Sequence, residues 1–392
     1  MELYIFNRNL EFQGIIDNFA SLRWVRRYLK CGEFELNCAL TPESLSLLSR
    51  ENIIYKKGDT EAGYIEYRNL KQDAEGKEIL VVKGKFLTGY LNRRIIWGTE
   101  ILNVTTEVAM RTLVNKNSIA PVDSNRILPN LMLGPLNSFT EVVDYQASYA
   151  NLLDEIESLS SISNLGFRVN LDIPNKMLDF EVYKGLDKSV NQSVNPRCIF
   201  SKEFENVLEQ EYTDSLNNYK NLALVGGIGE GTERKLIAVG NSSGLDRFEV
   251  FNDQKSLANT EDIDGVSTVM SNTDYNNLLI GKGNETLVET KEIQTFDSTI
   301  NSNSNLTYKV DFDLGDIVTY VSKKWGLTLD SRITEVEEVY EEAGPRINIT
   351  FGNNIPTILD KIKNMSKQKP SSGSSSTGGS PEITSIDGGN FV

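Results

Sequence analysis

Short alternations of apolar and polar residues dominate the chain and predict a mainly β protein. Residues 22–27 and 33–38 alternate on either side of Gly32, which predicts two strands joined by a tight turn. Residues 78–83 contain an unbroken apolar run and predict a buried strand. The same patterns predict further strands at 1–12, 53–55, 64–67, 198–201, 219–225, 235–239, 248–251, 306–312, 317–321, 333–338 and 346–352.

Two segments have a helical period instead. Apolar residues recur at near-helical spacing through 100–115, and residues 144–163 carry a longer apolar stripe that Asn164-Leu165-Gly166 ends. Residues 167–173 and 177–183 then alternate, which predicts a hairpin across Pro174-Asn175. The polar residues 254–292, with scattered Leu and Ile, predict one or two helices, and residues 355–365 predict a short final helix.

The two β-rich ends of the chain resemble each other and predict a duplicated β domain. The second copy is drawn from 191–252 and 306–355, with residues 253–305 inserted. Short strand patterns also recur by chance, so a coincidental likeness is the alternative. The corresponding features are Gly58-Asp59 with Gly315-Asp316, residues 32–36 with 247–250, and the 19-residue spacing of Ile65 and Gly84 with that of Ile333 and Gly352.

Composition narrows the classes of function. The 392 residues include 40 basic and 55 acidic side chains, a net charge of −15, and no histidine. The absence of histidine excludes Ser-His-Asp triads and His-ligated metals. All of the acidic excess lies after residue 100, and such a surface repels nucleic acid. Cys31, Cys38 and Cys198 are too few for a disulfide framework, and the charged N-terminus and lack of long apolar runs argue against a signal peptide or membrane span.

Candidate chemistry is sparse. The glycine-rich residues 226–231 lack nucleotide-loop spacing and are better explained as a hairpin loop. The patch at 23–28 mixes Arg with aromatic residues, but cross-strand Arg–Glu pairing explains it better than nucleic-acid binding. Asp262 and Asp264 lack the spacing of a calcium loop. Clustered carboxylates occur at Glu203/Glu205, Glu209/Glu211, Glu335/Glu337/Glu338 and Glu341/Glu342. We therefore expect no catalytic, cofactor-binding or metal-binding residues; a hydrolase that uses a carboxylate pair is the enzymatic alternative.

The C-terminus combines a linker with a distinct peptide. Residues 367–381 are rich in Ser and Gly and predict a flexible linker. Ile383, Ile386, Phe391 and Val392 follow it, and four apolar residues free in water have nothing to pack on. This pattern predicts a tethered docking peptide for a neighbouring protein, and a disordered terminus is the alternative.

A series of short segments recurs in a characteristic order and spacing: 22–28, 31–36, 63–66, 200–207, 219–221, 225–227, 244–249, 314–318, 332–336 and 349–352. Together these segments resemble a phage tail-tip or baseplate hub family of long-tailed phages and phage-tail-like particles. The resemblance covers about residues 1–355.

The resemblance implies a mainly β fold with α+β insertions and two tube-like β-barrels. Three chains would form a ring that adapts a six-fold tail tube to a three-fold tip, without enzymatic activity. The implied division is a first barrel at 1–125, an α+β lobe at 126–190, a second barrel at 191–355 with a partly helical insertion at 253–305, and a tail at 356–392.

The implied setting is the virion tail, with synthesis in the host bacterial cytoplasm. The implied partners are two further copies of the chain, a tail tube or distal tail ring protein, a tape-measure protein and a tip spike or fibre. DNA would pass the ring without being specifically bound, and no membrane anchoring is implied. A module that binds cell-surface carbohydrate is the remaining alternative to the structural role.

Overall fold

In a computed structural model of the chain, the described residues are 1–72, 74–263, 266–301 and 304–352. The chain divides into two compact units, 1–355 and 356–392. The predicted helix at 355–365, the linker and the docking residues Ile383, Ile386, Phe391 and Val392 lie outside the described residues.

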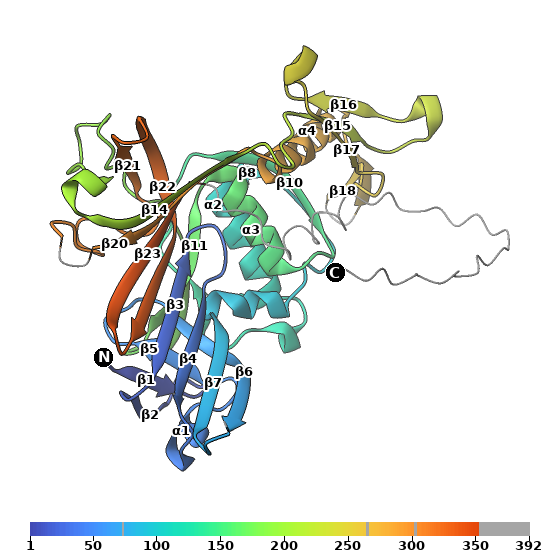
Figure 1. The fold of residues 1–392 in the computed structure, drawn as a ribbon. Helices are drawn as coiled ribbons and strands as arrows, with labels where there is room; N and C mark the ends of the chain where they lie inside the picture. Colours follow the sequence, from blue (N-terminus) through green and yellow to red (C-terminus); the bar gives the residue numbers. More distant parts are fainter. Residues whose placement is uncertain (73, 264–265, 302–303, 353–392) are drawn as a thin grey trace, which may run out of the picture. The chain divides into compact units, whose positions relative to one another are not determined.

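Strands form most of the regular secondary structure of the first unit, as the alternating sequence predicts (Figure 1). Their bounds are β1 Leu3–Phe6, β2 Phe12–Ile16, β3 Ser21–Arg27, β4 Glu33–Ala39, β5 Ile53–Lys56, β6 Ala62–Gln72, β7 Glu78–Phe86, β8 Thr99–Thr105, β9 Leu131–Leu133, β10 Val142–Ser148, β11 Gly166–Asp172, β12 Met177–Tyr183, β13 Ile199–Ser201, β14 Val207–Ser215, β15 Leu222–Gly226, β16 Leu236–Val239, β17 Glu249–Asp253, β18 Thr260–Ile263, β19 Val266–Val269, β20 Ile293–Ile300, β21 Ile317–Ser322, β22 Leu327–Glu341 and β23 Gly344–Gly352. The α-helices are α1 Pro42–Leu47, α2 Thr106–Val114, α3 Leu152–Ser163 and α4 Asn272–Glu289.

One large sheet runs through both β-rich ends of the chain. Its strand order is β14-β20-β23-β22-β3-β4-β7-β6-β5-β1-β2, with β21 also paired to β22 and β13 to β21. Every neighbouring pair from β14 to β6 is antiparallel. We call these eight strands, β14 to β6, the joined sheet.

The joined sheet contains the same strand order twice. The first half reads β3-β4-β7-β6, with β5 on β6, and the second half reads β14-β20-β23-β22, with β21 on β22. A bulge follows Ile65 in β6, and another follows Ile333 in β22. The amide of Ile65 donates to Asn52 (2.9 Å), and that of Ile333 donates to Asp316 (2.8 Å). Ile65 and Ile333 are therefore equivalent, as the sequence comparison predicts.

Two of the sequence matches are wrong in register. Gly58-Asp59 lies between β5 and β6, whereas Gly315-Asp316 precedes β21; the structural counterpart of Gly315-Asp316 is Glu51-Asn52, because the amides of Glu51 and Gly315 donate to the equivalent residues Ile65 and Ile333. Gly84 pairs with Ile65, but Phe351, not Gly352, pairs with Ile333. The equal 19-residue spacing is thus a coincidence, since the true spacing differs by one residue.

The insertion in the second half is also placed differently from the prediction at 253–305. It begins earlier, because β15, β16 and β17 form a separate sheet that packs on α4. It ends earlier too, because β20 is a strand of the joined sheet. Residues 247–250 are therefore not the structural counterpart of residues 32–36, because β17 pairs in parallel with β15.

In both segments that were predicted to be long helices, the first residues form a strand. Residues 99–105 and 142–148 pair as β8 and β10, and helices α2 and α3 begin only after them. In β10, Val143, Tyr145 and Ala147 are buried at alternating positions, which the longer apolar stripe concealed. The hairpin of β11 and β12 forms as predicted, with Asp172 opposite Met177.

Strand β3 passes from one hydrophobic core to another. Leu22 and Trp24 belong to the core of the first half and of the α+β region, whereas Tyr28 belongs to the core of the second half. Arg26 lies between them on the same face of the strand, fully buried. No helix among the described residues is long and apolar enough to cross a membrane.

Candidate functional site: the polar face of the joined sheet and its buried junction

One face of the joined sheet is mostly polar, although Val25, Val339, Val81 and Ile79 also belong to it. Directly paired residues share a face, so the register identifies its members. We call this the polar face; it comprises Glu209, Glu211 and Thr213 of β14, Asp297 and Thr299 of β20, Arg346, Asn348 and Thr350 of β23, Glu335 and Glu337 of β22, Arg23 and Arg27 of β3, Glu33, Glu35 and Asn37 of β4, Lys83 of β7, and Tyr67, Asn69 and Lys71 of β6.

Ion pairs neutralise the middle of the polar face. Arg23 and Arg27 both contact Glu33 (3.0 and 2.9 Å), which confirms the predicted cross-strand pairing of this Arg-rich segment. They also reach across to the second half, where Arg27 contacts Glu335 (2.7 Å) and Arg23 contacts Glu337. The neighbouring carboxylates hold the pKa of Arg27 above its ordinary value, although burial alone would lower it.

The two edges of the polar face have opposite charge. The β14 side carries Glu209, Glu211 and Asp297, and the β6 side carries Lys71 and Lys83. Burial, together with the nearby charge of Glu211, raises the pKa of Asp297. The uncompensated negative charge of this face is therefore concentrated beside β14.

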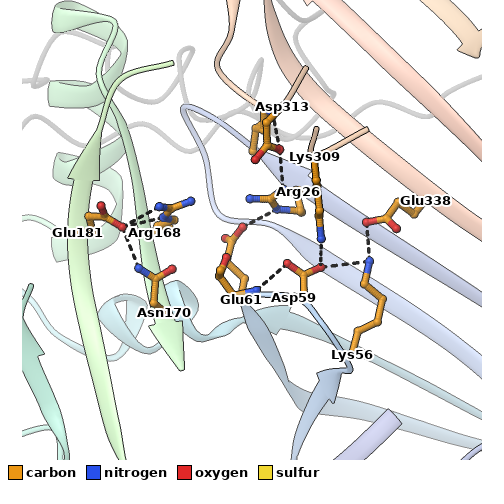
Figure 2. Close-up of polar contacts among 12 residues, drawn as sticks. Arg26, Lys56, Asp59, Glu61, Arg168, Asn170, Glu181, Lys309, Asp313 and Glu338 are labelled. Atoms are coloured by element: carbon orange, nitrogen blue, oxygen red, sulfur yellow. Dashed lines mark hydrogen bonds and ion pairs between the residues drawn. The ribbon is translucent and has the colours of Figure 1, made fainter. Parts of the chain in front are cut away.

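A buried ionic network lies at the boundary between the two halves (Figure 2). We call it the buried junction; it consists of Arg26, Lys56, Asp59, Glu61, Lys309, Asp313 and Glu338. Arg26 contacts Glu61 at 2.7 Å and Asp313 at 3.0 Å. Lys56 contacts Asp59 (3.1 Å) and Glu338, so both cations join residues of the first half to residues of the second.

Electrostatics within the buried junction are uneven, since three cations face four carboxylates. Burial would raise the pKa of Asp59, but the charges of Lys56, Arg26 and Lys309 hold it well below its usual value. For Glu61 the balance is reversed: burial outweighs the attraction of Arg26 and raises its pKa. Of Asp59 and Glu61, Glu61 is therefore the carboxyl group that is protonated more readily.

Removing one partner of such a network leaves an uncompensated charge in a region that is largely shielded from solvent. Arg26 also donates to the hydroxyl of Tyr308 (2.8 Å), and Lys56 lies over the ring of Trp24 (5.6 Å). The buried junction therefore fixes the second half against the first with little tolerance for change.

Acid is expected to weaken the buried junction through Asp59. Its folded pKa is below the value of about 3.9 in an unfolded chain, so it stabilises the fold above pH 4 and this contribution is lost as the pH falls below 4. Glu61, with a raised pKa, acts in the opposite direction: its contribution is present at low pH and is lost as the pH rises through its folded pKa.

The test is urea unfolding of the wild type and of Asp59→Asn at pH 7 and pH 3. We expect the difference in free energy of unfolding between the two proteins to be about 1 kcal/mol smaller at pH 3 than at pH 7. Asp17→Asn, at an exposed carboxylate outside the junction, should show the same small difference at both pH values. An equal effect of Asp59→Asn at both pH values would contradict the assignment.

An open groove of about 480 Å³ lies beside the second half of β6. Its lining includes Leu45, Tyr67, Arg68 and Leu70, and the side chains of Tyr67 and Leu70 are about half exposed. The Nη2 atom of Arg68 donates to the carbonyl oxygen of Leu45 (2.7 Å), while its Nε atom is buried without a hydrogen-bond partner among the described residues. The groove thus combines apolar contact area with an unsatisfied donor.

The structure distributes the clustered carboxylates over different surroundings. Glu335 and Glu337 are paired with arginines of β3, and Glu338 belongs to the buried junction. Glu209 and Glu211 point to the polar face, and Glu203 accepts a hydrogen bond from Ser201, which lowers its pKa. Glu341 contacts Arg346 at 3.2 Å, and its neighbour Glu342 lies exposed in the turn between β22 and β23.

The remaining candidate residues have structural surroundings. Residues 227–235 join β15 to β16, which confirms the predicted hairpin loop. All three cysteines are buried and free, and burial raises the pKa of Cys31 and Cys198. No cluster of Cys, Asp and Glu within the described ranges could hold a metal ion.

The buried junction itself was missed in the sequence, although one signal was present. Leu22, Trp24 and Tyr28 alternate as inward-facing residues, and Arg26 occupies the inward position between them. A charged residue at an inward position of a strand indicates a buried partner, but the sequence does not say which carboxylates approach it.

A family model described as Siphovirus ReqiPepy6 Gp37-like protein matches residues 2–353. A search of curated proteins found no match.

Solved structures share the fold at low sequence identity. Prophage tail protein gp18 from Listeria monocytogenes EGD-e is similar with a TM-score of 0.53 and 13% identity, over 94% of this chain and 99% of that one. The 43 kDa tail protein of prophage MuSo2 from Shewanella oneidensis gives 0.54 and 11%, over 90% and 98%. A tail protein from Neisseria meningitidis MC58 gives 0.51 and 11%, over 90% and 96%.

Proposed function

The chain belongs to the Siphovirus ReqiPepy6 Gp37-like family of phage tail proteins, and on that premise we propose that it is a structural hub of the tail tip or baseplate, assembled as a ring of three copies. In this role the ring adapts the six-fold tail tube to a three-fold tip. The copies act as a wall and carry out no chemistry.

The observation that carries this proposal is the duplicated strand order within the joined sheet. Two equivalent sets of strands are paired edge to edge, β22 with β3, in a single chain. Three copies present six equivalent sets, which is the number that a six-fold tube requires. Such a match of repeats lets a closed ring with three-fold symmetry meet a six-fold partner.

The polar face supports the same role. Its central arginines are paired with glutamates, and its surplus charge is negative. Such a surface binds phosphates weakly, because phosphate affinity comes from Lys and Arg and most of the cations on this face are paired. We propose that the polar face lines the channel that DNA passes through.

The test is the number of copies in the assembled particle. A cryo-EM map of tails should show three copies of this chain in one ring, with the joined sheets facing the channel. Six copies in the ring, or a position outside the tail axis as expected for a carbohydrate-binding module, would refute the proposal.

A further inference from the structure

The joined sheet ends in a free strand edge on each side. On one side, β14 pairs with no described strand other than β20. On the other side, β6 pairs with β5 only through residues 62–64, so the outer edge of residues 67–72 has no partner strand among the described residues. Free edges of this length readily pair with another chain unless something covers them.

The chain contains its own example of how such an edge is paired. β22 is the counterpart of β6, and on the edge away from β23 it pairs with two strands: residues 327–332 pair with β21, and residues 335–341 pair with β3. β3 is in turn the counterpart of β14. The pairing of β22 with β3 inside the chain therefore corresponds to a pairing of β6 with β14. The described residues of one chain do not form this second pairing.

We propose that residues 67–72 of β6 pair with β14 of a second copy, antiparallel and in the register that β22 uses with β3. This inference rests on the proposed ring and identifies the contact that closes it.

Equivalent residues fix the register. Gly84 and Phe351 are equivalent because they pair with Ile65 and Ile333. Their other neighbours, Phe34 and Phe296, then correspond, and the partners of these two are Trp24 and Tyr212. Both partner pairs are aromatic contacts, with ring centroids 5.8 and 5.5 Å apart.

Counting from the bulges gives the residues that meet. Val339 lies opposite Arg23, and the counterparts of these residues are Lys71 and Glu211. Val336 lies opposite Arg26, which places Arg68 opposite Asp214. Glu338 lies opposite Trp24, which places Leu70 opposite Tyr212. The register therefore joins two pairs of opposite charge and one apolar pair.

The residues brought together are otherwise poorly satisfied. Lys71 and Glu211 are exposed, and neither forms an ion pair within the described residues. Arg68 has a buried Nε without a partner, and Leu70 is half exposed at the groove. A one-residue slip would place these side chains on opposite faces, so the complementarity is specific to this register.

Strand direction is consistent with a closed ring. Eight antiparallel strands alternate in direction, so β14 and β6 run in opposite directions. Rotation about an axis along the strands keeps each direction, and β14 of the next copy therefore meets β6 antiparallel. The contact is heterologous, and it closes when the rotation closes.

A pair of cysteines tests the contact. Lys71→Cys and Glu211→Cys in one full-length chain, incorporated into tails and mildly oxidised, should give cross-linked dimers and trimers and no larger species on a non-reducing gel. Residues directly opposite in a sheet lie at about 5 Å, within the Cα range of a disulfide. The native cysteines are buried and do not compete.

Three controls make the result specific. Each single-cysteine variant should remain uncross-linked, whereas a symmetric β14–β14 or β6–β6 contact would give dimers. Lys71→Cys with Thr213→Cys, displaced by two residues, should cross-link at least about tenfold less, because diagonal neighbours lie about 7–8 Å apart. Cross-linking of a single variant, or equal yields from both pairs, would overturn the proposed contact.

Charge reversal tests the same contact if cysteine variants fail to assemble. Lys71→Glu and Glu211→Lys should each lower the yield of complete tails at least about tenfold, and the double variant should restore it. Lys176→Glu, on an exposed hairpin turn, is the matched control and should have no effect. Failure of the double variant to restore assembly would overturn the contact. Three copies in the ring without this cross-link or rescue would refute the contact alone, whereas a different copy number would refute the proposed function.

Discussion

Replacing Arg26 with methionine is expected to lower the free energy of unfolding by about 3–5 kcal/mol. The guanidinium group is buried and contacts Glu61 and Asp313. Methionine fills similar space but leaves the buried carboxylate of Glu61, which is 5% exposed, without its cation. Urea unfolding at pH 7, followed by tryptophan fluorescence, measures the loss.

Two further variants separate charge from packing. Arg23→Met lies on the same strand, but the Arg23 side chain is 40% exposed, so its loss should cost about 1 kcal/mol or less. The double variant Arg26→Met/Glu61→Gln should be more stable than Arg26→Met alone, because it also removes the stranded carboxylate. If the double variant is less stable than the single one, uncompensated charge is not the cause.

The second large effect is expected at Gly84, where alanine should cost about 3 kcal/mol or more. A Cβ atom at this position would lie 1.8 Å from the carbonyl oxygen of Tyr64 and 2.7 Å from the ring of Phe34. The carbonyl is part of the backbone of β6 next to its bulge, so it cannot move without disturbing the pairing of β6 with β7. The same unfolding measurement applies.

Gly76→Ala is the matched control for Gly84→Ala. Gly76 lies in open space with a φ of +84°, so alanine there meets no atom within 4 Å and should cost only about 1 kcal/mol of backbone strain. A loss at Gly84 no larger than at Gly76 would show that the strands separate easily at this point.

The strands could be predicted from the sequence where an alternation or an unbroken apolar run marked a buried strand. Residues 22–27, 33–38 and 78–83 became β3, β4 and β7 because one face of each is buried in a core. β20 was missed since its buried Thr295 and Ser298 make the alternation look polar. Inward-facing hydroxyl groups carry no hydrophobic signal.

The duplication could be predicted in outline but not in register. Ile65 and Ile333 were matched correctly, yet a glycine was matched with a glycine where the structure matches Gly84 with Phe351. Next to Gly84 the ring of Phe34 occupies the space, whereas Phe351 supplies its own ring and packs on Phe200. Two different residues fill equivalent positions, and only the pairing of the strands reveals the equivalence.

The pairing of β3 with β22 has a consequence for how the protein is synthesised. Arg23 and its partner Glu337 are 314 residues apart, so β3 emerges from the ribosome long before the strand that covers its edge. At about 5–20 residues per second, this interval is roughly 15–60 s. During this interval β3 can pair with β4, while the edge of β3 that later pairs with β22 has no partner. Charged residues along an edge discourage pairing with a foreign strand. Arg23 and Arg27 later form ion pairs between the two halves. We therefore expect them, before that, to protect the nascent chain from aggregation.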